Sequence, residues 1–216
     1  MTAATARKRV VAFISGGGSN MLALARATQA ADYPAEIVAV ISDKADAGGL
    51  AKAQALGIPT FAFARRDYDS KDAHEAAILA ELERLSPDIL CLAGYMRLLS
   101  GAFIKRYEGR ILNIHPSLLP LFPGLHTHQR AIDARMTEAG CTVHFVTEGM
   151  DEGPVVLQGT VPILGDDTAE TLAARVLRVE HLLYPQALLQ VASDRVRMED
   201  GRTVRSPAKA LNTSTP

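Results

Sequence analysis

Residues 10–25, VVAFISGGGSNMLALA, decide the fold class of this chain. The run Val10–Ile14 is short, apolar and rich in β-branched residues, which favours a buried strand. Three consecutive glycines follow it, and the apolar spacing from Met21 onward is typical of a helix. A strand, a glycine-rich turn and a helix in this order are typical of the opening unit of an α/β protein with a parallel sheet.

The same alternation continues through the first half of the chain. Its apolar runs predict further strands and helices, the strands at 36–41, 60–64, 88–93 and 110–114 and the helices at 49–56 and 72–85. Strands that are apolar along their whole length predict a parallel sheet with helices on both faces. The sequence therefore predicts a Rossmann-like α/β fold with an open, mostly parallel sheet.

The second half has a different pattern. Strands predicted at 142–146 and 154–161 flank the turn-like segment 148–153, so they can pair antiparallel and extend the same sheet. A long amphipathic helix is predicted at 168–191, and Pro185 is expected to kink it or to end its first part. Asp200-Gly201 predicts a hairpin between two short strands, 195–198 and 203–205.

We find no repeat and no linker that would divide the chain, and we predict one domain over residues 1–216. Residues 9–113 are expected to form a phosphate-binding half and residues 114–193 a catalytic half. The small, polar residues 206–216 are expected to form a frayed, disordered tail.

Composition and charge exclude several classes of protein. Hydrophobic residues make up 48% and charged residues 22% of the 216 positions, as in a globular protein with a substantial core. The net charge is only −1, which disfavours nucleic-acid binding because that requires a basic face. No apolar run approaches the roughly 20 residues of a membrane span, and MTAATARKR lacks the apolar core of a signal peptide.

These features predict a cytoplasmic protein that binds neither nucleic acid nor membrane. Cys91 and Cys141 agree with that location. Each lies in an apolar run without a CxxC pattern, so we expect two buried free thiols in a reducing compartment.

The turn Gly16–Asn20 is a candidate anion site. It follows the first strand, where open α/β sheets bind ligands, and it offers backbone N–H groups at the start of a helix. The dinucleotide pattern GxGxxG fails at Met21, although Asp43 stands where a ribose-binding acid could lie, and no Walker pattern follows. The pattern favours the phosphate of a mononucleotide-like substrate. The alternative is a purely structural turn in which Ser19 caps the helix.

Asn113 and His115 form a second candidate site. One residue separates them in an extended segment, so their side chains face the same side at the end of a strand. The amide can donate a hydrogen bond and the imidazole can donate or exchange a proton, so the pair can stabilise an oxyanion. Asp151, in a glycine-flanked loop, is the best candidate for the carboxylate that orients His115. This pattern leaves a structural role for His115 equally open.

Several histidines near these positions also leave metal binding open. No metal-ligand spacing such as HExxH is present, however. His126 and His128 are first interpreted as the start of a helix after Gly124.

The chain resembles the folate-dependent glycinamide ribonucleotide formyltransferases from about Arg9 to Ser193. The resemblance rests on four stretches, which are ISGGGSN at 14–20, AGYMRLL at 93–99, NIHPSLLP at 113–120 and the segment 140–154 from GCTVHFV to DEGP. It implies the formyltransferase fold and direct transfer of a formyl group from 10-formyltetrahydrofolate to the amine of glycinamide ribonucleotide in purine synthesis. It implies neither a metal nor a covalent enzyme intermediate.

The resemblance also implies roles for individual residues. Asn113 and His115 would stabilise the oxyanion, and Asp151 would support His115 and relay a proton to the leaving nitrogen. The substrate would be bound by Gly18, Ser19 and Asn20 at its phosphate and by Glu180 at its ribose. The folate would be bound by Lys71, Met96, Arg97, Leu98, Leu99, Asn113, Thr147, Glu148, Gly149, Met150 and Asp151.

The chain departs from the family pattern at two positions. Lys71 stands where the family often has arginine, and Leu121 stands where some members have lysine, which puts the affinity for the folate tail in doubt. Local pattern alone also permits structural readings, with Met96 and Leu98 as core, Glu180 on a solvated helix face and Lys71 as a surface residue at a helix start.

Three alternatives share part of this pattern. A formyltetrahydrofolate hydrolase would carry an additional N-terminal domain. The first strand is expected to begin so close to Met1 that such a domain would not precede it. A methionyl-tRNA formyltransferase would need a C-terminal RNA-binding domain and a basic balance of charge. A non-enzymatic nucleotide sensor would have no need of Asn113, His115 and Asp151 together. We expect small-molecule substrates and a monomer or homodimer.

Overall fold

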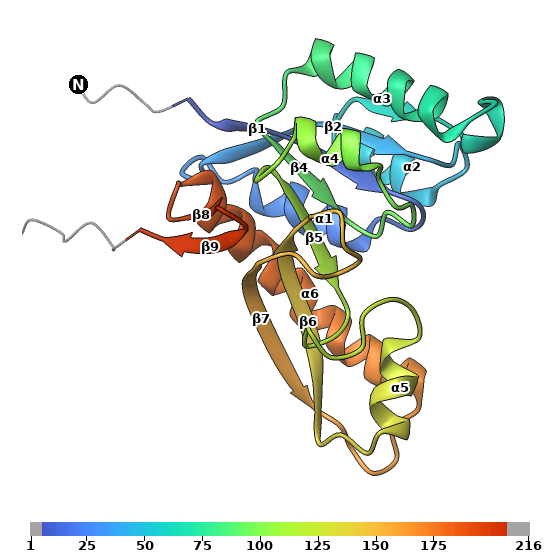
Figure 1. The fold of residues 1–216 in the computed structure, drawn as a ribbon, viewed down its shortest axis with the longest axis vertical. Helices are drawn as coiled ribbons and strands as arrows, with labels where there is room; N and C mark the ends of the chain where they lie inside the picture. Colours follow the sequence, from blue (N-terminus) through green and yellow to red (C-terminus); the bar gives the residue numbers. More distant parts are fainter. Residues whose placement is uncertain (1–5, 207–216) are drawn as a thin grey trace, which may run out of the picture.

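The computed structural model describes residues 6–206 and is built on one seven-stranded sheet. The strand order is β3-β2-β1-β4-β5-β6-β7 (Figure 1). Strands β1 to β5 are mutually parallel, whereas β6 and β7 are antiparallel additions to the edge at β5. The strands are β1 (Lys8–Ile14), β2 (Ala35–Ser42), β3 (Thr60–Ala62), β4 (Ile89–Leu92), β5 (Ile111–His115), β6 (Glu138–Phe145) and β7 (Val155–Pro162).

Helices cover both faces of this sheet. One core contains buried side chains of α1, α2, α5 and α6, and the other contains those of α3 and α4. Because α1 and α6 contribute to the same core, they lie on the same face of the sheet. The helices are α1 (Ser19–Ala27), α2 (Gly48–Ala55), α3 (Lys71–Leu85), α4 (Gly101–Arg106), α5 (Thr127–Asp133) and α6 (Ala169–Ala192), with a 3₁₀ turn at Arg65–Asp67.

Strand β1 shows why its sequence is apolar throughout. Val10, Ala12 and Ile14 pack into the core under α1 and α6, whereas Val11 and Phe13 pack into the core under α3 and α4. Successive side chains of a strand point to opposite faces, so a strand covered on both sides has no polar position. The predicted α/β fold with an antiparallel extension is confirmed.

Helix α6 corrects one expectation. It runs unbroken over 24 residues and includes Pro185, so the expectation that Pro185 ends its first part is wrong. Proline removes one backbone hydrogen bond from a helix. Neighbouring side chains of the helix, Leu183, Tyr184, Ala187 and Leu188, are buried in the core, and this packing maintains the helix across the proline.

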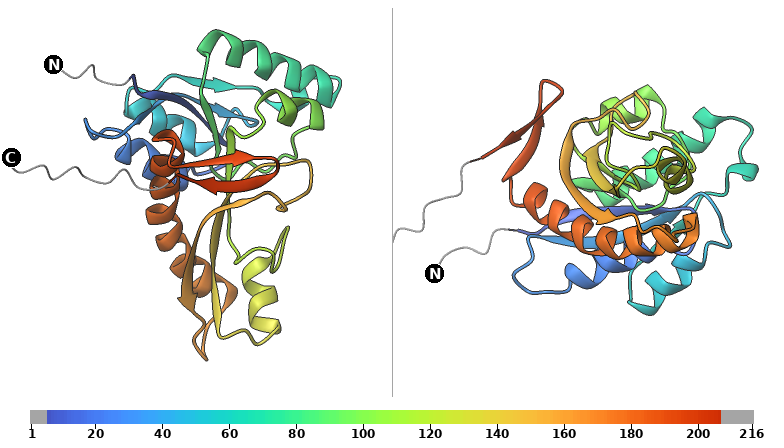
Figure 2. Two further views of the ribbon diagram at one scale, coloured as in Figure 1. Left: turned by 60° about the vertical axis from the view of Figure 1, so that its left-hand side comes forward. Right: turned by 90° about the horizontal axis from the view of Figure 1, so that it is seen from below.

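The remaining elements lie at the periphery. Asp200-Gly201 joins β8 (Val196–Glu199) to β9 (Arg202–Arg205), as predicted, and Figure 2 shows this hairpin beside the sheet. The short helix α4 escapes prediction because six residues are too few to show a helical period. The expected tail at 206–216 lies outside the described residues after Ser206. Within residues 6–206, no helix is long and apolar enough to cross a membrane.

The order of the strands determines where a ligand can enter. Strands β2 and β3 follow β1 on one side of the sheet, and the chain then crosses to β4 on the other side of β1. The loops that leave β1 and β4 therefore run apart, and a crevice opens at the carboxyl ends of these strands. The glycine-rich turn follows β1, the loop from Ala93 to Ser100 follows β4, and His115 ends β5.

Candidate active site

A cavity of about 560 Å³ lies in this crevice. Its walls combine residues from the end of β5, from three loops and from the helices α1, α5 and α6. The lining residues are Asn20, Gly94, Tyr95, Met96, Arg97, Leu98, Asn113, Ile114, His115, Pro116, Gly124, Leu125, His126, Thr127, His128, Met150, Asp151 and Glu180. The predicted trio of Asn113, His115 and Asp151 is therefore brought to one cavity.

His115 is buried at the end of β5 and lies between two acceptors. Its Nε2–H donates to the backbone carbonyl of Phe122 at 3.0 Å, because a carbonyl oxygen can only accept. Its Nδ1 lies 3.4 Å from Oδ2 of Asp151. The two ring nitrogens therefore face two fixed acceptors, which sets the orientation of the imidazole in the cavity.

Asp151 is held in place by a second contact. The backbone N–H of Gly124 donates to Oδ2 of Asp151 at 2.9 Å, which joins two loops over the cavity. The backbone of Asp151 is left-handed, with φ of 56°. Aspartate and asparagine tolerate this conformation better than most residues because their short polar side chains can hydrogen-bond locally.

His144 is a site residue for which the sequence argument assigned no role. It faces Asn113 across the antiparallel pair β5–β6. Its Nδ1–H donates to the carbonyl of Phe145 at 2.9 Å, and burial lowers the pKa of the ring, so its Nε2 is left as an acceptor.

Asn113 is oriented by this histidine. Its Nδ2 donates to Nε2 of His144 at 3.2 Å, while the same Nε2 lies 3.7 Å from Asp151. An amide nitrogen carries two hydrogens. The second is available to the cavity that Asn113 lines. The signal that could have identified His144 is its position in GCTVHFV, directly across from the strand NIH.

Asn20 and Glu180 meet at another part of the cavity wall. Nδ2 of Asn20 donates to Oε2 of Glu180 at 2.6 Å, and both side chains are buried. Burial raises the pKa of the Glu180 carboxyl, and the Asn20 hydrogen bond offsets only part of this rise. Within the described residues, Oδ1 of Asn20 is buried without a hydrogen-bond partner. The reading of Glu180 as a solvated helix residue is therefore wrong.

The glycine-rich turn leaves the start of α1 without a side-chain cap. The N-cap is Gly18, with φ of 69°, and no side chain bonds the first amides, so the alternative in which Ser19 caps the helix is wrong. A Cβ on Gly18 would come within 2.9 Å of Gly49 Cα, which means that α2 packs directly against the turn. Uncapped amides at a helix start favour an anion.

The loop after β4 forms an apolar wall of the cavity. Met96 and Leu98 are each 66% exposed, so their interpretation as core residues is wrong. Leu125 and Met150 are exposed on other lining segments. Exposed apolar side chains gathered around one cavity are typical of a site for a flat, largely apolar ligand.

Other predicted folate-binding residues do not line this cavity. Leu99 packs against the core under α3 and α4, and Lys71 lies 3.8 Å from Glu75 at the start of α3. Thr147 and Glu148 line a separate cavity of about 320 Å³ beside α4 and β8. Their roles, and that of Gly149, remain predictions.

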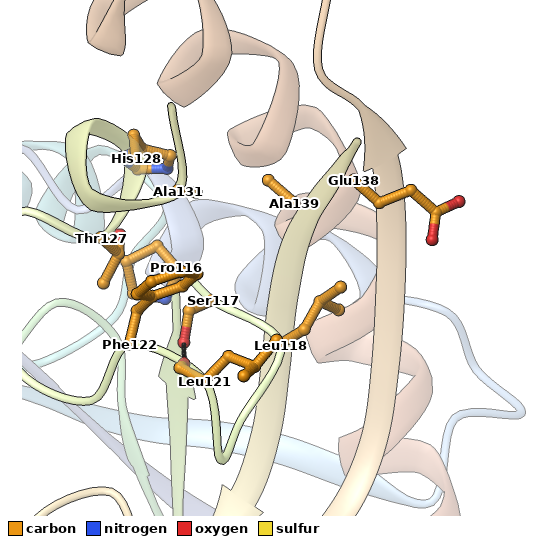
Figure 3. A pocket seen from close by; sticks show the side chains of 10 residues that line it. All are labelled: Pro116, Ser117, Leu118, Leu121, Phe122, Thr127, His128, Ala131, Glu138 and Ala139. Carbon is orange, nitrogen blue, oxygen red and sulfur yellow. Dashed lines mark hydrogen bonds between the residues drawn. The ribbon is translucent and has the colours of Figure 1, made fainter. Parts of the chain in front are cut away.

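The histidines near the site are not arranged around a common point. Among residues 6–206, no group of three or more His, Cys, Asp or Glu side chains is placed to hold a metal ion. His126 is the N-cap of α5, as its position after Gly124 predicted. His128 also lines a small neighbouring pocket of about 10 Å³ (Figure 3), which is room for roughly one water molecule.

Comparison with known proteins relates this arrangement to a family. Residues 8–188 match the family model described as formyl transferase. The chain is 43% identical over 191 residues to phosphoribosylglycinamide formyltransferase of Escherichia coli K12, which covers 88% of this chain and 90% of that protein. The crystal structure of phosphoribosylglycinamide formyltransferase from Brucella melitensis is 72% identical, with a TM-score of 0.84, over 87% of this chain and 96% of that one.

A longer relative matches the same region. The bovine trifunctional purine biosynthetic protein adenosine-3 is 49% identical over 91% of this chain, but the chain spans only 20% of that protein's length. The shared segment is thus one part of the trifunctional protein. Because the family model covers most of the chain, and the Escherichia coli relative matches over nearly its full length, this chain belongs to the formyl transferase family.

Proposed function

We propose that this chain transfers the formyl group of 10-formyltetrahydrofolate to the amine of glycinamide ribonucleotide, a step of purine synthesis. The observation that carries the proposal is the convergence of Asn113, His115 and Asp151 in one cavity that Asn20 and Glu180 also line. The names of its relatives support the same reaction.

In the proposed reaction, the substrate amine forms a bond to the formyl carbon, and the bond from that carbon to the folate nitrogen breaks. The free N–H of Asn113 and the imidazole of His115 stabilise the negative charge that develops on the formyl oxygen. A proton leaves the attacking amine and reaches the leaving nitrogen, and Asp151 supports this movement beside His115.

Each ligand is assigned to part of the cavity. The phosphate of glycinamide ribonucleotide lies at the uncapped start of α1, on Gly18, Ser19 and Asn20, and Glu180 accepts from the ribose hydroxyls. The folate lies against Met96, Arg97 and Leu98, whose exposed side chains suit a flat heterocycle. In this proposal residues 9–113 hold the phosphate and residues 114–193 supply His115 and Asp151. Asn113 and Arg97 are contributions of the first half to catalysis and folate binding, and Glu180 is a contribution of the second half to ribose binding.

We also propose a cytoplasmic location. Cys91 and Cys141 are both free and buried, as predicted. Thiols in this state suit a reducing compartment.

The function is tested with the purified chain by following the folate absorbance. The formyl donor is supplied with glycinamide ribonucleotide, with water alone or with initiator tRNA. Tetrahydrofolate is expected to form only when glycinamide ribonucleotide is present, in equal amount to the formylated product. Release of formate in water alone would instead indicate a hydrolase, and formylation of the tRNA would indicate a different transferase.

The phosphate turn is tested at Gly17, which is exposed. A Cβ there has no atom within 4 Å, unlike one at Gly18. Gly17→Ala is expected to raise the KM for glycinamide ribonucleotide about 10-fold or more, because a methyl group at the turn weakens charge-assisted hydrogen bonds to the phosphate.

Gly48→Ala is the matched control for the turn. Gly48 is also exposed with open space around its Cβ, but it begins α2. This control is expected to leave the KM unchanged. If Gly17→Ala also leaves the KM unchanged, the glycine-rich turn does not bind the substrate phosphate.

Glu180→Gln is expected to separate stability from binding. Because the folded state favours the protonated carboxyl, folding stability falls as the pH rises from the ordinary value of 4.5 through the raised pKa. Glutamine cannot ionise, so the variant should unfold at an equal or higher temperature than the wild type at pH 7. Its KM for glycinamide ribonucleotide should rise about 10-fold, since an amide is a weaker acceptor than a carboxylate.

Glu170→Gln on the same helix is the control for Glu180→Gln. A hydrogen bond from the helix backbone lowers the pKa of Glu170, which is the opposite direction. This control should leave the KM unchanged and should not raise the unfolding temperature at pH 7. A Glu180→Gln enzyme with an unchanged KM would show that Glu180 does not bind the substrate.

A further inference from the structure

We infer that Asp43 is a positioning residue of the cavity, which orients Arg97 and holds the loop of residues 94–100 against the glycine-rich turn. Only the identity of the ligand in this inference rests on the proposed function. The sequence analysis considered Asp43 as a ribose-binding acid. The structure instead engages both of its carboxylate oxygens with the protein.

Ser15 connects Asp43 to the loop. It is the last residue before the three glycines, and it follows β1, which lies between β2 and β4 in the sheet (Figure 1). Its N–H donates to the carbonyl of Gly94 at 3.1 Å, and its Oγ accepts from the N–H of Met96 at 2.9 Å. Its hydroxyl in turn donates to Oδ1 of Asp43 at 2.5 Å.

The second oxygen of Asp43 holds Arg97. Nε of Arg97 donates to Oδ2 at 3.0 Å, and the Asp43 side chain is 2% exposed whereas that of Arg97 is 46% exposed. The guanidinium is a planar fork with five N–H groups, and the bond to Asp43 uses the one on Nε, so it holds the plane of the group while the terminal nitrogens keep their own N–H groups. Within the described residues these terminal nitrogens make no hydrogen bond, and Arg97 lines the cavity.

Arg97 also borders a second space. It lines a cavity of about 250 Å³ with Lys44, Arg65 and Arg66, and with the acidic residues Asp43 and Asp46. The basic side chains of this second cavity therefore outnumber its two carboxylates, so its lining carries a net positive charge. Arg97 thus lies between the two cavities. Its orientation, which Asp43 sets, determines how its guanidinium binds an anionic group of a ligand there.

The other end of the loop is anchored independently. The N–H of Ser100 donates to Oε1 of Glu75 at 2.9 Å, its hydroxyl donates to Oε2, and Glu75 is buried. Loss of the Asp43 contact is therefore expected to release Arg97 without freeing the whole loop. Burying the carboxylate of Asp43 costs free energy, and its hydrogen bonds to Ser15 and Arg97 offset this cost.

The variant Asp43→Asn tests the inference. Asparagine has the same size and can still accept from Ser15, but its amide N–H then faces Nε–H of Arg97. We expect the Kd for tetrahydrofolate, measured by calorimetry, to rise about 10-fold or more, because a hydrogen bond between charged groups is lost. The KM for the formyl donor should rise in parallel, while the KM for glycinamide ribonucleotide stays within about 2-fold of the wild type.

Two comparisons distinguish positioning from general stability. Arg97→Ala alone should weaken tetrahydrofolate binding, and adding Asp43→Asn to it should cause little further loss, because Asp43 acts through Arg97. Asp167→Asn removes another paired carboxylate, which lies 2.6 Å from Arg175 and outside the cavity. This control should lower the unfolding temperature and leave tetrahydrofolate binding unchanged.

The outcomes separate this inference from the proposed function. An unchanged Kd in Asp43→Asn, or losses that add fully in the double variant, would overturn the positioning role. If Asp43→Asn does not fold, Arg97→Lys tests the same contact, since lysine keeps the charge but loses the fork, and an unchanged Kd there would also overturn it. Wild-type protein that binds tetrahydrofolate but transfers no formyl group would contradict the proposed function alone, and wild-type protein that does not bind it would overturn both.

Discussion

Asp151→Asn is expected to lower turnover by roughly 100- to 10,000-fold while both ligands still bind, as is typical when a proton-transfer group is lost. The carboxylate lies 3.4 Å from Nδ1 of His115, and in the proposed reaction it supports this ring while the proton moves. Asparagine removes the charge but keeps the size and an oxygen that accepts from the N–H of Gly124. It also tolerates the left-handed backbone at this position.

Single-turnover rates at saturating ligands, measured across pH, test this expectation. The pH–rate profile should change shape, because a carboxylate that takes part in the proton transfer is gone. Asp194→Asn is the matched control, since Asp194 is exposed and also left-handed, with φ of 55°. It should keep full turnover. If Asp151 were only a turn residue, Asp151→Asn would resemble this control.

His115→Ala is expected to lower turnover by roughly 100- to 1000-fold, the usual cost of removing one donor to an oxyanion. The ring is buried at the end of β5 and is held by the Phe122 carbonyl and Asp151. Both ring nitrogens face acceptors in this structure, so His115 donates to the formyl oxygen only by giving up one of these contacts; alanine removes that donor and leaves Asp151 without its partner. The Kd of each ligand should change much less than turnover, because Asn20, Glu180 and the apolar wall remain.

His74→Ala is the control for this variant. His74 is buried and its Nε2 donates to the carbonyl of Phe63 at 2.8 Å, a contact of the same kind as that of His115. It lies outside the cavity lining, so its replacement should lower the unfolding temperature and leave turnover intact. Near wild-type turnover in His115→Ala would contradict the role assigned to His115.

The sequence by itself determined the architecture and the location of the site. Continuous apolar strands specify a parallel sheet that is covered on both faces when, like Val10–Ile14, they alternate with amphipathic helices. Successive side chains of a strand point to opposite faces, so an unbroken apolar run means that both faces are buried. The same pattern shows where strands end, and so it placed the glycine-rich turn and Asn113 and His115 at the ligand edge.

Only the tertiary structure decided which distant residues meet at that edge. Asn20 and Glu180 are 160 positions apart and still share a hydrogen bond, and His144 orients Asn113 through strand register. Asp43 accepts a hydrogen bond from Arg97, and Leu99 packs against the core under α3 and α4. Periodicity reports which face of an element is buried, whereas such long-range partners depend on strand order, register and loop paths that no local pattern contains.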